Sequence, residues 1–135
     1  MRWLSLLLAA FLLAPLSGAV AAATQEPEWR QASEHHILLR PFAFEPREIR
    51  LPAGEPVRLY FVNSGQATLS FTAGGFFAAS RVRSGDADLV RGGTIRLAPG
   101  ERRSVLLVAR AGRYHLRSGN FLHRLLGMAG RIIVE

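Results

Sequence analysis

The segment that decides the fold is RYHLRSGNFLHRLLGMAGRIIVE, residues 113–135. Its first part, residues 114–118, alternates apolar and polar side chains, which predicts a half-buried strand. A short loop follows, in which His123 and Met128 lie five residues apart. The segment ends in a β-branched run, residues 131–134, which predicts a closing strand. An imidazole and a thioether in one loop are candidate metal ligands.

The rest of the chain shows the same pattern of short strands and turns. Apolar residues alternate along several further runs, and turn signals containing Pro, Gly or Asn separate most of them. The runs cover residues 37–39, 42–44, 49–51, 57–62, 69–71, 94–97 and 105–108. Strands at this spacing predict an all-β Greek-key sandwich.

One connection is too long for a simple turn. The segment between Gly74 and Gly93 contains a Phe76-Phe77 pair and then a polar, turn-prone stretch. The pair predicts either one helical turn or a packed loop. Long connections between strands often carry function, and the alternative is a surface excursion that the two phenylalanines hold in place.

Residues 1–23 are expected to be a signal peptide rather than part of the fold. An apolar run at residues 4–16 follows the basic Arg2, and small residues follow the run. The alternative is an uncleaved membrane anchor. We expect a flexible lead-in over residues 24–35 and one domain over residues 36–135. Cleavage would leave a periplasmic or secreted protein that does not span the membrane, without cysteine for a disulfide or a lipid anchor.

Charge narrows the possible partners. The formal net charge is +7, every basic residue is arginine, and the arginines are scattered along the chain. Nucleic-acid binding would need a basic stripe with interleaved aromatic residues, so we expect no nucleic-acid partner. The charge favours a weak attraction to an anionic membrane surface or to an acidic protein.

Several short fragments of the sequence follow one another in an order that is typical of one family. They are Phe44-Glu45-Pro46 with Pro52-Ala53-Gly54, Phe61-Val62-Asn63-Ser64-Gly65, Pro99-Gly100-Glu101 with Ala111-Gly112-Arg113-Tyr114, and the loop residues His123, Gly127 and Met128. Together they resemble the cupredoxin family over residues 36–135. The resemblance implies a small exported sandwich that holds copper through two imidazoles, a thiolate and a long axial thioether.

Two of the four ligands that the resemblance implies are missing. Leu69 stands where the family has its first histidine, and Ser118 stands where it has its cysteine. A thiolate gives a blue copper site its covalency, whereas a serine hydroxyl is a poor copper ligand near neutral pH. His123 and Met128 remain as candidate metal ligands, with ordinary packing as the alternative for each. We therefore expect a degenerate site in an exported binding or accessory protein that needs no cofactor, although copper stays possible.

A rebuilt copper site is the alternative function. A periplasmic copper-binding or carrier protein would use His123 and Met128 with a further histidine, and Cu(I) would suit the soft thioether. The other histidines of the chain are His35, His36 and His115. Because His35 and His36 are adjacent, they point to opposite faces of a strand and do not pair by themselves.

The sequence shows no enzyme motif. Ser118 lacks the Gly-x-Ser-x-Gly elbow of a hydrolase, and phosphate-loop, zinc-protease and dinucleotide fingerprints are absent. We therefore expect no catalysis. Large apolar residues flank the loop histidine, and the resemblance implies that they dock a protein partner; the alternative is that they close the core. They are Phe121, Leu122, Leu125 and Leu126.

Overall fold

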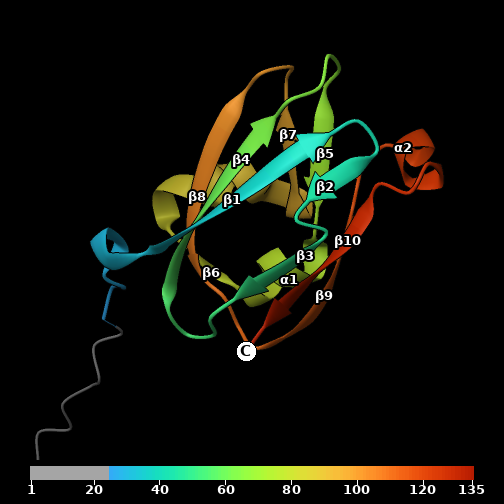
Figure 1. Cartoon of the computed structure of the whole chain (residues 1–135). Helices are drawn as coiled ribbons and strands as arrows, with labels where there is room; N and C mark the ends of the chain where they lie inside the picture. The colour runs from blue at the N-terminus through green and yellow to red at the C-terminus, as the bar shows by residue number, and fades with distance from the viewer. Residues whose placement is uncertain (1–24) are drawn as a thin grey trace, which may run out of the picture.

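The computed structural model describes residues 25–135, which form two facing β-sheets (Figure 1). The expected signal peptide, residues 1–23, lies outside the described residues. The first sheet has the order β2 (Ala43–Glu45), β1 (Ser33–Arg40), β4 (Pro56–Asn63), β8 (Arg102–Val108), β6 (Arg81–Val82). The second has the order β3 (Glu48–Leu51), β10 (Ala129–Val134), β9 (Gly112–Arg117), β5 (Leu69–Thr72), β7 (Thr94–Leu97). The helical segments are η1 (Trp29–Gln31), α1 (Gly74–Ala79), η2 (Ser84–Gly93) and α2 (Phe121–Leu125).

Each sheet combines parallel and antiparallel strand pairs. β1 runs parallel to β4, and β10 runs parallel to β3, with Ile132 opposite Ile49. The remaining pairs, including β4 with β8 and β9 with β10, are antiparallel. This arrangement of two packed sheets confirms the all-β sandwich that the sequence predicts.

The core lies between the sheets, and the alternation of residues along the strands places it there. In β4, Val57, Leu59 and Phe61 are buried, while the residues between them are partly exposed. The Phe71 ring on β5 meets the Phe61 ring at a centroid distance of 4.8 Å, so side chains of the two sheets interlock. Edge-to-face aromatic pairs of this kind add to the hydrophobic stabilisation of a core.

The first strand starts earlier than expected. β1 pairs with β4 from Ser33 onward, with Ser33 opposite Val57, although the domain was expected to start at His36. The segment Trp29–Gln31 within the expected lead-in forms the 3-10 turn η1. Ser33 and Glu34 carry no apolar signal because both are exposed in the strand, so hydrophobic patterning could not locate this boundary.

The long connection between β5 and β7 is structured. The Phe76-Phe77 pair lies in α1, the helical turn that the sequence left as one of two options, and both rings are buried. β6 then adds an edge strand to the first sheet, and η2 returns the chain to the second. Gly93 has φ +77°, and a Cβ built on it would lie 2.5 Å from the Gly74 Cα, so the two ends of the connection touch at backbone distance. Within residues 25–135, no helix is long and apolar enough to cross a membrane.

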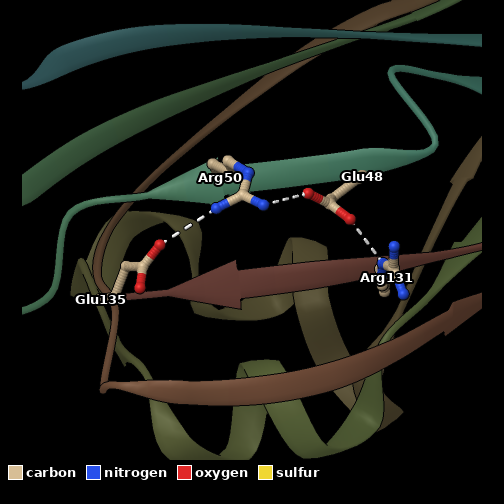
Figure 2. A network of polar contacts seen from close by, with 4 residues as sticks. All are labelled: Glu48, Arg50, Arg131 and Glu135. Carbon is tan, nitrogen blue, oxygen red and sulfur yellow. Dashed lines mark hydrogen bonds and ion pairs between the residues drawn. The ribbon is translucent and has the colours of Figure 1, made fainter.

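Ion pairs link β3 to β10 on the exposed face of the second sheet (Figure 2). Arg50 lies 2.6 Å from Glu48 and 3.0 Å from Glu135, and Arg131 lies 2.6 Å from Glu48. Hydrogen bonds from Arg131 and Arg50 lower the pKa of Glu48. Exposed pairs of this kind stabilise a fold only weakly, but they neutralise both acids of this face.

Candidate functional site

The candidate site lies where β9 ends and α2 begins. Ser118 is the first residue after β9, and its side chain is fully buried. Its Oγ atom accepts a hydrogen bond from the Asn120 amide at 3.2 Å and lies 3.5 Å from Nδ1 of His123. Ser118 and His123 therefore meet side chain to side chain.

The segment that carries His123, predicted as a short loop, contains the short helix α2. The Asn120 side chain accepts hydrogen bonds from the amides of Leu122 and His123 at 2.9 and 3.4 Å, and so caps the helix at its first turn. Gly127 follows the last turn with φ +91°, as glycine often does after a helix. An Asn and a Gly at this spacing in the sequence indicate a helix, although only a loop was predicted here.

Met128 closes the loop against the body of the protein. Its side chain is fully buried and belongs to the main hydrophobic core. Its backbone carbonyl accepts from the Ser118 amide at 3.1 Å, and its amide donates to the His123 carbonyl at 3.0 Å. The two candidate metal ligands and Ser118 are thus joined by backbone hydrogen bonds, and packing already accounts for the methionine.

Leu69 lies on β5, the strand that pairs with β9, and Ser118 directly follows β9. β5 and β9 pair through Thr72 and Arg117. Continuing this antiparallel register by one residue sets Phe71 opposite Ser118. Leu69 lies two residues from Phe71 on the same inward face of β5 and is buried. Leu69 and Ser118, which the sequence predicts at the positions of two ligands, therefore face the same interior.

A side-chain bond fixes the two segments against each other. The Gly119 amide donates to Oγ of Ser70 at 2.7 Å, which ties β5 to the residues after β9. A Cβ on Gly119 would lie 2.8 Å from the same oxygen, so a larger residue here would have to displace the Ser70 hydroxyl. Leu69, Gly119 and Asn120 also line one open cleft of about 440 Å³.

His123 has an aromatic neighbour, Phe42, that was not predicted from the sequence. The Phe42 ring meets the imidazole edge to face at a centroid distance of 5.6 Å. Phe42 lies in the tight turn between β1 and β2, with φ +65°, a conformation that non-glycine residues rarely adopt. The contact joins segments that are far apart in the chain, so no local pattern could have revealed it.

The other histidines lie elsewhere. His36 stacks on Tyr60 at 5.0 Å, and His35 bonds to Ser33 at 3.1 Å, both in the first half of β1. β1 ends at Arg40, roughly 13 Å beyond His36 at the usual rise per residue. The turn after Arg40 contains Phe42, which contacts His123, so His35 and His36 lie farther back along β1.

His115 is exposed on β9, opposite Arg131. Residues 25–135 contain no group of three or more His, Asp or Glu side chains able to hold a metal ion. In the described part of the chain, the contacts of His35 and His36 are with Ser33 and Tyr60 rather than with His123.

The apolar residues around His123 do not close the core. Phe121, Leu122, Leu125 and Leu126 are 61–66% exposed, and we call these four residues the apolar tip. The alternative that they seal the sandwich after loss of a ligand is therefore wrong. Figure 1 shows α2 outside the body of the sandwich, near β2.

Comparisons with known proteins bear on the fold. No protein-family model matches the sequence, and no curated protein matches it. Among solved structures, reduced auracyanin from the photosynthetic bacterium Roseiflexus castenholzii is 16% identical with a TM-score of 0.57, and the match covers 77% of this chain and 98% of that one. Auracyanin B is 22% identical with a TM-score of 0.57, and the match covers 84% of this chain and 93% of that one. The two packed sheets and these structural matches together show that the protein has a cupredoxin-like fold.

Proposed function

We propose that this protein is an exported cupredoxin-fold binding or accessory protein without a working blue copper site. The observation that carries the proposal is the pair Leu69 and Ser118, which are both buried, with Ser118 in contact with His123, and which provide no thiolate and no second imidazole. A blue copper site needs both. The residues present therefore do not fit the copper centre that the fold family implies, and the proposal gives the protein no role in electron transfer.

The chemistry of the remaining donors supports the same conclusion. The Ser118 oxygen already accepts from the Asn120 amide, and the hydroxyl has His123 as its second partner. In residues 25–135 no carboxylate bonds to the imidazole, so the pair also lacks the third group that orients histidine as a base. We infer binding rather than catalysis, in the periplasm or outside the cell, and we place the binding surface at the apolar tip.

Copper loading tests this proposal. The protein is purified under native conditions from the exported fraction of cells grown with added copper, and its metal content is measured by mass spectrometry. We expect less than stoichiometric copper and no intense visible absorption after Cu(II) addition. A stoichiometric, intensely blue or green protein would show that the proposal is wrong.

A copper carrier is the second candidate, because His123 and the buried Met128 thioether lie in one loop and Cu(I) favours soft ligands. Titration with Cu(I) against a competing chelator separates it from the first. A carrier would bind more tightly than roughly micromolar and lose affinity in His123→Ala but not in His115→Ala, which removes an exposed histidine from β9. Equal, weak binding in all three proteins would exclude the carrier.

A further inference from the structure

We propose that the apolar tip docks this protein on the surface of an anionic lipid bilayer. The proposal depends on the proposed function only for export, which brings the protein to membrane surfaces. It assigns no ligand to the interior around Ser118, so its test is independent of copper.

The first argument is the form of the tip. Phe121 and Leu125, like Leu122 and Leu126, are four residues apart, so all four side chains share one broad face of α2. His123 faces the body instead, where it meets Ser118. Large apolar patches on a soluble surface mark interaction sites.

The second argument is charge. From residue 102 to residue 134 the sequence contains no Asp or Glu, and it contains seven arginines. Arg124 lies in α2 with its guanidinium 5.8 Å from the Phe121 ring centroid, and Arg117 ends the strand before it. Neither forms an ion pair with any of residues 25–135. Apolar side chains with the unpaired Arg124 and Arg117 close to them complement an anionic bilayer, whose headgroups attract cations while its acyl region accepts Phe and Leu.

The acidic residues near the apolar tip do not cancel the positive charge of these arginines. Glu48 and Glu135, on the adjoining sheet, are both engaged by arginine, as Figure 2 shows. Glu45, on β2, is paired with Arg40. An acidic protein groove could also accept the tip, but the tip stands outside the sandwich with each side chain more than half exposed (Figure 1). A bilayer can envelop such a projection without a preformed groove, and so we assign the lipid.

The tip is held rigidly enough to enter an interface. Asn120 caps α2, Ser118 anchors the preceding turn, and the Phe42 ring supports His123 from the β1–β2 turn. Phe42 is itself 45% exposed and extends the apolar surface toward β2. Insertion therefore needs no rearrangement of the core.

Vesicle flotation tests the proposal with protein purified from the exported fraction. One set of vesicles is pure phosphatidylcholine, and the other contains phosphatidylglycerol as well. We expect binding to the anionic vesicles, weak or no binding to the neutral ones, and weakening with added salt. The Leu125→Gln/Leu126→Gln variant should bind at least tenfold more weakly. Circular dichroism should show that it stays folded, because both side chains are exposed.

A matched pair of variants isolates the charge. Arg124→Gln should weaken binding about fivefold, the factor for one arginine at an anionic surface. Arg110→Gln should not, because Arg110 is also exposed and free of ion pairs with residues 25–135 but lies at the other end of β9. The proposal is wrong if the protein binds neither kind of vesicle, or if the Leu125→Gln/Leu126→Gln variant binds as tightly as the unaltered protein. It is also wrong if the tip binds a protein and no lipid. Stoichiometric copper binding would overturn the proposed function, but it would not change the vesicle-binding results expected here.

Discussion

Asn63 is the side chain whose removal most directly tests how the fold holds the strand that carries Leu69. Its amide group is fully buried at the end of β4. Nδ2 donates to the carbonyls of Ala67 at 2.8 Å and Leu97 at 3.0 Å, and Oδ1 accepts from the Gly65 amide at 2.8 Å. One side chain therefore fixes the turn before β5 and ties it to the end of β7. We expect Asn63→Ala to be among the most destabilising single changes in the protein.

The magnitude follows from the number of bonds. A net contribution of about 1 kcal/mol for each hydrogen bond gives a loss of about 3 kcal/mol, and the partners left unsatisfied in a buried turn can raise it. With a urea m-value of about 1.5 kcal/mol/M for a domain of this size, the unfolding midpoint should fall by about 2 M. A loss of this size is a large part of the stability of a small domain.

Urea unfolding followed by circular dichroism measures this loss. Ser64→Ala is the matched control, because the exposed Ser64 makes a single side-chain bond, to the Leu39 carbonyl at 3.3 Å. We expect the control to lower the midpoint by well under ~1 M. Equal midpoints for the two variants would refute the idea that the Asn63 amide holds this turn.

Three further predictions concern other parts of the fold. Gly93→Ala should cost more than ~1 kcal/mol in urea unfolding, because of the positive φ and the backbone of Gly74 2.5 Å from the added carbon; a neutral effect would contradict the close approach. Asp86→Ala should cost about 1–3 kcal/mol, since it leaves a buried β8 amide without its acceptor at 3.0 Å, and a wild-type midpoint would contradict this. Burial, and then the charge of the neighbouring histidine, lowers the pKa of His35 below its ordinary 6.5, so its contribution to stability is fully present above 6.5 and is lost as pH falls from there through the lowered pKa. Midpoints measured between neutral and mildly acidic pH should therefore depend less on pH in His35→Asn, with His115→Asn as the control for loss of a histidine; an unchanged slope in His35→Asn would exclude this role.

The sequence predicted the sandwich because most of its strands have one buried and one exposed face. The alternation of residues 57–62 reports the burial of β4 directly. β6 was missed because Arg81 and Val82 are too few to alternate, and only pairing with β8 makes them a strand. α2 was missed for another reason. Its exposed side chains are nearly all apolar, so it lacks the polar face that identifies a surface helix, and only Asn120 and Gly127 indicated it.

The sequence could predict which site residues lie close together in the chain, but not the contacts between segments that are distant in sequence. The sequence predicted one loop for His123 and Met128 directly after the strand that ends at Ser118, and backbone and side-chain contacts join the three residues. The position of Leu69 depends on the register of β5 against β9, and the Phe42 contact depends on a turn with unusual backbone geometry. Sequence spacing specifies neither, because both depend on how distant segments pack.

The proposed function depends most on whether Leu69 and Ser118 occupy the positions of two absent copper ligands. The direct measurement is the visible spectrum of a Leu69→His/Ser118→Cys variant with Cu(II), beside the unaltered protein and the Ser118→Cys single variant, all checked for folding by circular dichroism. We expect intense thiolate-to-copper absorption in the double variant and none in the unaltered protein. A folded double variant that stays colourless, or an unaltered protein that is already intensely coloured, would contradict the claim.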